Sequence, residues 1–264
     1  MDCISWYTDL ASRGFPLQET LEFLDGLSKS DDIGSHFRIC CMDAERPVSE
    51  RKSGASLLFL DRGRAGIDYL MPLLDADDRT ASHAAFLLAS FRPWVLPLSS
   101  GEGAAVRRAL ARLAESDDAM VRRRSIIAIG WIGTEEEIPL LSRHLLTDED
   151  AYCRAWSASS FLQMPDILRE TIQTEAKGSL IACLESEQDA FVKGTAVEAV
   201  MAVWDVSFGL RSSAVEERNR RAVDRAARKA LKFLKSEARS SAMMRARTLG
   251  YPPGCLPTVV LYHV

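Results

Sequence analysis

The sequence lacks the short motifs by which many enzymes and metalloproteins are identified. It has no G-x-S-x-G, no phosphate-binding loop, no G-x-G-x-x-G and no H-E-x-x-H. Its six cysteines include no C-x-x-C pair, and its four histidines do not have the spacing of metal ligands. We therefore expect no catalytic residues, no metal site and no cofactor, and we predict that the protein is not an enzyme.

Long apolar runs are missing as well. No segment approaches the ~20 apolar residues that a membrane-spanning helix needs. The first residues do not combine a basic stretch with a long apolar one, as a secretory signal would. The net charge of −4 gives no general attraction to nucleic acid or to an anionic membrane. The sequence therefore predicts a cytoplasmic protein that binds neither nucleic acid nor a membrane.

What the chain does contain is a repeat. Residues 117–164 have the pattern of a helix, a short turn, a second helix, an acidic turn and a third helix. Related turns occur before and after this stretch, at separations of 40, 32 and 39 residues, which is the range of helical-hairpin repeats. The four turns align on Asp78, Asp118, Asp150 and Asp189.

The residues that follow each aligned aspartate have a consistent character. The third is apolar, the seventh is small, and the fourth is basic in three of the four turns. We expect the aspartate to cap the following helix and the basic residue to pair with it. The small residue should let neighbouring helices approach closely. In turn order, the third residues are Ala81, Val121, Cys153 and Val192, the fourth are Ser82, Arg122, Arg154 and Lys193, and the seventh are Ala85, Ser125, Ser157 and Ala196.

This pattern resembles the HEAT-repeat superfamily over roughly residues 65–205. The segment Asp118 to Gly133 is particularly similar to the HEAT-like repeats of the phycobilisome-lyase type. The resemblance implies an all-α fold, a right-handed α-solenoid of stacked helical hairpins, and it says little about activity. The motif residues are Asp118, Val121, Arg122, Ser125, Ala128, Ile129, Gly130, Ile132 and Gly133.

We interpret residues 1–264 as a single α-solenoid domain. Residues 1–64 are helical but irregular and should form an N-terminal cap, while 65–205 hold the repeats. Residues 206–238 should hold a long basic helix, because 211–247 contain twelve Lys and Arg against four Asp and Glu, which leaves −12 on the rest of the chain. The remaining 239–264 should be an extended tail, either a strap along the solenoid or a docking segment.

Candidate binding residues follow from the same register. Positions five, six, nine and thirteen after each aspartate should face away from the core, toward the concave side. Trp and Arg, the residue types that dominate protein interfaces, occur there without any role in the repeat pattern. The alternative for the tryptophans is that they pack between helical layers. The predicted partner-binding residues are Arg123, Arg124, Ile127, Trp131, Trp156, Glu198 and Trp204.

These features favour a non-catalytic scaffold that is a monomer on its own and grips a partner protein with its concave face. Such a small solenoid resembles some bacterial immunity proteins, which neutralise a cognate toxin. Two alternatives remain open. One is a HEAT-like protein of DNA binding, DNA repair or cofactor-lyase chemistry. The other is an adaptor that docks an acidic partner on the basic helix, through Arg218, Arg221, Arg225, Arg228 and Lys232.

Overall fold

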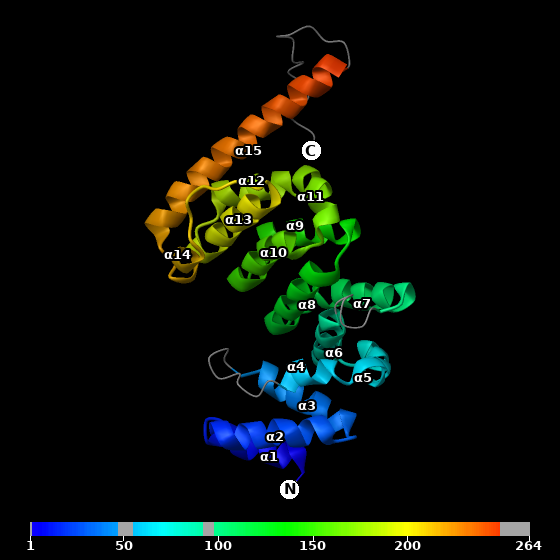
Figure 1. Ribbon diagram of the computed structural model, residues 1–264. Helices are drawn as coiled ribbons and strands as arrows, with labels where there is room; N and C mark the ends of the chain where they lie inside the picture. The colour runs from blue at the N-terminus through cyan, green and yellow to red at the C-terminus, as the bar shows by residue number, and fades with distance from the viewer. Residues whose placement is uncertain (1, 47–54, 92–97, 249–264) are drawn as a thin grey trace. The chain divides into compact units, whose positions relative to one another are not determined.

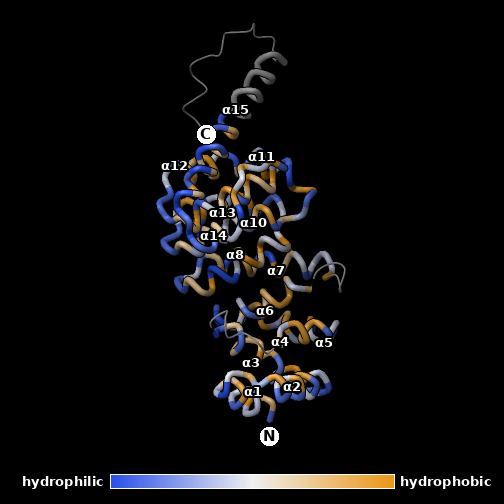
Figure 2. The backbone as a smooth tube through the Cα atoms, turned by 60° about the vertical axis from the view of Figure 1, so that its left-hand side comes forward, coloured by the Kyte–Doolittle hydropathy of each residue, from blue (hydrophilic) through white to orange (hydrophobic). Residues whose placement is uncertain are grey.

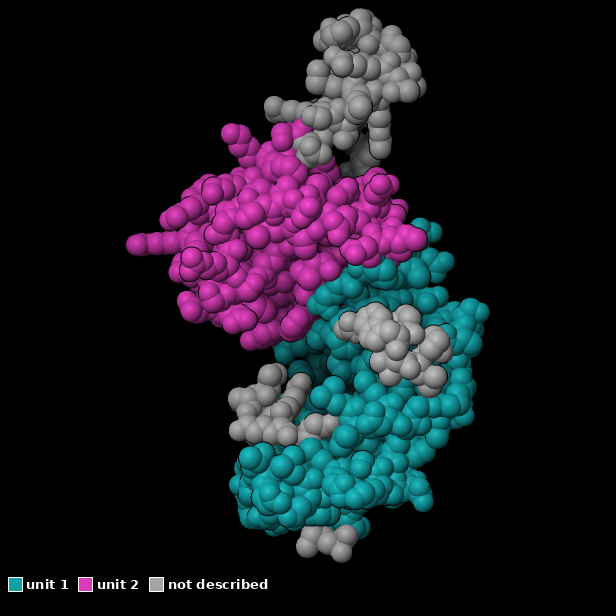
Figure 3. Space-filling view, viewed as in Figure 1, with its two compact units in different colours: residues 1–137, 163–165 teal, residues 138–162, 166–264 magenta. Residues whose placement is uncertain are grey.

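The computed structural model describes residues 2–46, 55–91 and 98–248. Every regular element in this part of the chain is a helix, which confirms the predicted all-α fold (Figure 1). The contacts divide the chain into two compact units (Figure 3). Unit 1 comprises Met1–Glu137 with Gln163–Pro165, and unit 2 comprises Ile138–Leu162 with Asp166–Val264.

Unit 1 contains the described helices of residues 1–64, which were expected to form an N-terminal cap, and the first repeats. Helix α1 (Cys3–Ser12) packs on α2 (Leu17–Lys29) and α3 (Ile33–Ala44). In the repeats, α6 (Asp78–Ser90), α7 (Ser100–Leu113) and α8 (Ala119–Ile132) pack on one another. Phe23, Phe59 and Leu110 are among its fully buried side chains. The helices are α1 (Cys3–Ser12), α2 (Leu17–Lys29), α3 (Ile33–Ala44), α4 (Ala55–Leu60), α5 (Gly63–Leu70), the 3-10 helix η2 (Met71–Asp75), α6 (Asp78–Ser90), α7 (Ser100–Leu113), α8 (Ala119–Ile132) and η3 (Glu135–Glu137).

Unit 2 continues the hairpin pattern. Helix α12 (Lys177–Ser186) packs on α9 (Ile138–Thr147) and α13 (Ala190–Val203). Helix α15 (Arg220–Thr248) lies along both α12 and α13. Hydrophobic and hydrophilic residues alternate along the helices of both units (Figure 2), as each helix buries one face. The helices are α9 (Ile138–Thr147), α10 (Ala151–Gln163), η4 (Asp166–Leu168), α11 (Arg169–Glu175), α12 (Lys177–Ser186), α13 (Ala190–Val203), α14 (Ser212–Glu216) and α15 (Arg220–Thr248).

The third and seventh positions of the repeat form the core, as predicted. All eight of these side chains are buried, and the four small ones are completely so. Two of the small residues are serines, whose hydroxyls donate to backbone carbonyls within their own helices. Ser125 Oγ lies 2.9 Å from the carbonyl oxygen of Val121, and Ser157 Oγ lies 2.8 Å from that of Cys153. A buried serine is therefore compatible with close helix packing because its polar atom is satisfied.

Aspartates cap the helices as predicted, but in the first repeat the capping residue is one position earlier than expected. Asp118 accepts a hydrogen bond from the backbone N–H of Met120, and Asp189 caps α13 in the same manner. In the first repeat, however, the cap of α6 is Asp77 and not Asp78: its Oδ1 lies 3.1 Å from the amide nitrogen of Thr80. Asp78 instead forms an exposed ion pair with Arg112 at 2.8 Å. Two adjacent aspartates made this choice undecidable from the pattern alone.

The basic residue at the fourth position was expected to pair with the aspartate of its own turn, and for Arg154 and Lys193 this is wrong: they pair with Glu187 and Asp224. The Asp150 and Asp189 carboxylates accept from backbone amides at the starts of their helices instead.

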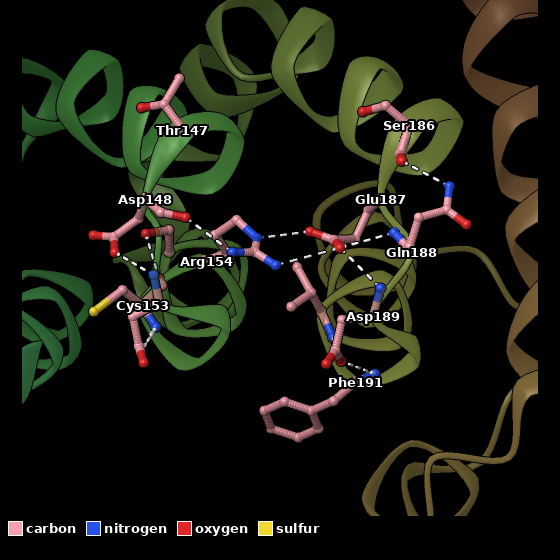
Figure 4. A network of polar contacts seen from close by, with 12 residues as sticks. Thr147, Asp148, Cys153, Arg154, Ser186, Glu187, Gln188, Asp189 and Phe191 are labelled. Atoms are coloured by element: carbon pink, nitrogen blue, oxygen red, sulfur yellow. Dashed lines mark hydrogen bonds and ion pairs between the residues drawn. The ribbon is translucent and has the colours of Figure 1, made fainter.

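Arg154 Nη1 donates to the backbone carbonyl of Asp148, 2.9 Å away, while its Nε donates to Glu187 Oε2 at 2.7 Å (Figure 4). Glu187 in turn accepts from the amide of Asp189 at 2.8 Å. Burial alone would raise the pKa of Glu187, but the hydrogen bonds from Arg154 and the amides outweigh it and leave that pKa lowered. One arginine thus joins two consecutive turns.

The C-terminal region differs from the single long helix expected within residues 206–238. It contains the short α14 and the long α15, separated by a turn in which Arg218 has a left-handed backbone, with φ of 52°. Helix α15 then continues to Thr248, beyond the predicted boundary at 238. Its buried face contains Val223, Ala230 and Leu234, as the spacing predicted. Residues 249–264 of the predicted tail lie outside the described residues.

None of the helices in the described ranges combines the length and the apolar character that crossing a bilayer requires.

The corrected cap of α6 can be tested by comparing two neighbouring substitutions. Asp77→Ala removes the acceptor for the Thr80 amide and should lower the free energy of unfolding by about 1 kcal/mol. Asp78→Ala removes only an exposed ion pair and should cost less, in the range of ~0–1 kcal/mol. Urea denaturation of both variants measures the difference, and a larger loss for Asp78→Ala would contradict the assignment.

The link between turns predicts a pH-dependent loss of stability. Arg154→Met leaves the mostly buried Glu187 carboxylate without its guanidinium and should cost about 2–3 kcal/mol at pH 7. Because the folded-state pKa of Glu187 is depressed, this stabilisation is present above its unfolded pKa of ~4.3 and lost as the pH falls through the lower folded value. The denaturation curves of wild type and Arg154→Met should therefore differ at pH 7 and converge as the pH falls through the lowered folded-state pKa of Glu187. Arg169→Met, at an exposed pair, is the control and should show little loss at either pH.

Candidate functional site

The predicted binding residues of unit 1 lie on α8, and the structure uses one of them differently. Arg123 and Ile127 are half-exposed, as expected. Arg124 was expected to face outward, and this is wrong: it is buried, with 9% of its surface exposed. Its Nη1 donates to Ser82 Oγ at 2.6 Å, because position six of α8 faces α6. Arg124 therefore ties two helices together and is not a surface residue.

Trp131 also serves packing, as the alternative interpretation proposed. Its ring lies 4.9 Å from that of Phe86, between centroids, and the residue is half-buried. The indole Nε1 donates to Gln163 Oε1 at 2.7 Å, so the polar atom of this tryptophan is satisfied within unit 1. A partner could touch only part of the ring.

A polar cluster beside Arg124 was not anticipated. Glu45 Oε1 accepts from Arg79 Nε at 2.6 Å and lies 3.3 Å from His83 Nε2. Burial, together with nearby Arg124, lowers the pKa of His83 to about 4, and burial raises the pKa of the Cys41 thiol to about 12. Both groups are neutral at pH 7, so they form no thiolate–imidazolium pair of the kind that makes cysteine nucleophilic. The cluster joins α3 to α6, and sequence spacing offered no signal for it.

In unit 2, the structure brings two predicted residues together. Trp156 of α10 and Glu198 of α13 line the same cavity, which has a volume of about 170 Å³. Helix α14, which follows α13 in the chain and packs on it, supplies the remaining wall. We call this cavity the α14 pocket. Its lining residues are Ala155, Trp156, Ser159, Phe191, Thr195, Glu198, Ser212, Val215 and Glu216.

Helix α14 is held in place by a close contact with α13. Val215 is buried against Gly194, where an added Cβ would lie 2.8 Å from Val215 Cγ1. That distance is shorter than real Cβ contacts, so only glycine accepts α14 at this position. Gly194 occupies position five, which the sequence placed on the outward face. A glycine there, inside a strong helical pattern, was the available signal that another backbone or side chain approaches closely.

Arg218 lies in the turn after α14 and contacts residues of α10 and of the start of α13. Its Nη1 lies 3.2 Å from Asp189 Oδ2, and its Nη2 lies 3.4 Å from the Tyr152 hydroxyl oxygen. The guanidinium also lies over the rings of Tyr152 and Phe191, at 5.8 and 5.5 Å from their centroids. Arg218 was predicted to belong to the basic surface of the C-terminal helix, and this is wrong: it precedes α15 and joins the turn to α10 and α13.

The electrostatics of the α14 pocket are acidic. Glu198 is half-buried, Glu216 is exposed, and neither carboxylate has a hydrogen bond or an ion pair with the described residues. The neighbouring cation, Arg218, is already paired with Asp189. The pocket therefore combines two uncompensated carboxylates with an indole and a phenyl ring.

The remaining predicted residues lie elsewhere in unit 2. Trp204 is half-buried at the C-terminal end of α13 and is not part of the pocket lining. Arg221, Arg225, Arg228 and Lys232 are all exposed on α15, opposite its buried face. In the described residues, no three His, Cys, Asp or Glu side chains are grouped as metal ligands would be.

The close contact between Gly194 and Val215 of α14 predicts that a glycine-to-alanine substitution at residue 194 destabilises the protein. Gly194→Ala should lower the free energy of unfolding by about 1–3 kcal/mol, because the new methyl group overlaps Val215. Gly178→Ala is the control: nothing lies near its Cβ position in α12, so it should stabilise the protein by up to ~1 kcal/mol.

Val215→Ala in the Gly194→Ala background should recover part of the loss. A double-mutant cycle measured by urea denaturation would show this as non-additivity. Additive losses would mean that α14 is not seated on Gly194 in solution.

Comparison with known proteins identifies one segment of the chain. Neither the curated proteins nor the solved structures include a match. Residues 67–161, from α5 to α10, match the family described as HEAT repeats. HEAT repeats generally mediate protein interactions, and their stacked hairpins with buried small positions are what this segment shows. Residues 67–161 therefore belong to the HEAT-repeat superfamily.

Proposed function

We propose that this protein is a non-catalytic scaffold that binds another protein through the outward positions of α10 and α13 in unit 2. The proposal is carried mainly by Trp156, a half-buried tryptophan on the wall of an open pocket, beside the Glu198 carboxylate, which has no ion pair with the described residues. Tryptophan in such a setting is the residue type that contributes most to protein interfaces. In unit 1, taken by itself, Arg123 and Ile127 of α8 are half-exposed side chains that the repeat pattern does not require.

The partner that we propose to test first is a protein toxin, with this chain as the immunity protein that neutralises it. Support comes from the architecture: a small helical-repeat chain with irregular first helices and two uncovered carboxylates in a recessed site. Such a complex should be one-to-one and tight. A gene for a secreted toxin next to this one would support the assignment. If co-expression with that toxin gave no protection to the host cell, the toxin assignment would be wrong.

A second candidate is an adaptor that binds an acidic partner on α15. The observation that favours it is the row of exposed cations Arg221, Arg225, Arg228 and Lys232, which lie away from the face buried on α12 and α13. Opposite charges over such a row would increase the rate of association and make binding sensitive to salt. This candidate predicts that charge reversal on α15, and not changes at the α14 pocket, abolishes binding.

Affinity capture from the native host separates the two candidates. Immobilised wild-type protein should retain a partner that Trp156→Ala retains at least ~30-fold more weakly, since a central tryptophan contributes about 2 kcal/mol or more. Arg228→Glu with Lys232→Glu should retain the partner at wild-type strength. Arg169→Glu, an exposed residue of α11, is the matched control. The opposite pattern, with loss only in the α15 variant, would favour the adaptor, and circular dichroism must show that each variant is folded.

A further inference from the structure

We propose that the α14 pocket binds a cationic side chain, an arginine or a lysine, presented by the protein partner. This inference rests on the proposed function and specifies the chemistry by which that partner is recognised. It depends on the volume, the charge and the aromatic walls of the pocket.

The volume suits one side chain. At about 170 Å³ the cavity is smaller than the ~300–1,000 Å³ of pockets that hold drug-sized ligands or cofactors. It is open on one side and is formed by three helices of the same unit. A long side chain projecting from a partner's surface can enter it without any rearrangement of the partner's backbone.

The charge of the pocket selects a cation. Glu198 and Glu216 have no ion pair with the described residues. Arg218, in the turn after α14, pairs with Asp189, and Lys193 of α13 pairs with Asp224 at 3.5 Å. An apolar side chain would remove water from Glu198 without pairing it, which costs free energy. An acidic side chain would be repelled. An ammonium or guanidinium group would instead pair with both carboxylates.

The aromatic walls add a second source of affinity. Trp156 lines one side of the pocket and Phe191 another, and indole is the most favourable ring for a cation–π contact. The structure contains a precedent within the same chain, because the Arg218 guanidinium already lies 5.5 Å from the Phe191 ring centroid. An incoming arginine could therefore stack on Trp156 much as Arg218 stacks on Phe191 and Tyr152.

Fluorine NMR with the full-length chain tests the proposal directly. The protein is labelled with 5-fluorotryptophan, and the Trp156 resonance is assigned by its loss in Trp156→Phe. The probes are N-acetyl-arginine N-methylamide and N-acetyl-lysine N-methylamide, with N-acetyl-citrulline N-methylamide as the uncharged isostere of the arginine probe. The cationic probes should shift the Trp156 resonance in a saturable manner, and the citrulline probe should bind at least ~10-fold more weakly.

Glu198→Gln keeps the shape of the pocket and removes one charge, so it should weaken the cationic probes by ~10-fold or more. Glu170→Gln, at an exposed position on α11, should leave their affinity unchanged. Equal binding of citrulline, an unchanged affinity in Glu198→Gln, or no saturable shift up to ~100 mM probe would overturn the proposal. Thermal denaturation of Glu198→Gln confirms that the variant is folded.

The same variants distinguish a failure of this inference from a failure of the scaffold function. A partner that is captured equally by wild type and Glu198→Gln, with no probe binding, would leave the scaffold intact and refute the cation pocket. Saturable binding of the probes without capture of any protein would establish the pocket and remove its support for a protein partner.

Discussion

Close contact between helices at small side chains is the constraint on which the rest of the structure depends. The seventh residue after each aligned aspartate is alanine or serine, and all four are fully buried. Only such small residues let the backbones of neighbouring helices approach closely. The serines meet this requirement because their hydroxyls donate to carbonyls of their own helices. Gly194 extends the same principle to the outward face, where it admits Val215 of α14.

Polar side chains hold the turns in register once the helices have packed. Arg154 binds the carbonyl of Asp148 in its own turn and the carboxylate of Glu187 in the next one (Figure 4). Glu187 also binds the amide of Asp189, which caps α13 and pairs with Arg218. The pair of Arg154 with Glu187 is mostly shielded from water and charge-assisted, so it is stronger than an exposed ion pair. Two consecutive hairpins are therefore coupled through their turns as well as through their cores.

The same packing determines which outward residues remain available to a partner. Arg124 and Trp131 are occupied by contacts within unit 1, with Ser82 in one case and with Phe86 and Gln163 in the other. Trp156 and Glu198 face a pocket that no side chain of the described chain fills. Much of the function that we propose is thus located where the described part of the chain gives the Trp156 ring and the Glu198 carboxylate no partner.

The sequence by itself determined the all-α class, the repeat and its core positions, because these depend on spacings within a single helix or hairpin. It also placed Trp156 and Glu198 at outward positions and among the predicted partner-binding residues. Only the tertiary structure decided that Asp77 caps α6, that Arg124 is buried, and that Arg218 leaves the basic helix for an aromatic platform. The cap is a choice between two adjacent aspartates that have the same local spacing. The burial of Arg124 and the position of Arg218 depend on side chains that are tens of residues apart in the chain. A local periodicity carries no information about contacts between residues that are distant in sequence. The α14 pocket is formed by such contacts among α10, α13 and α14.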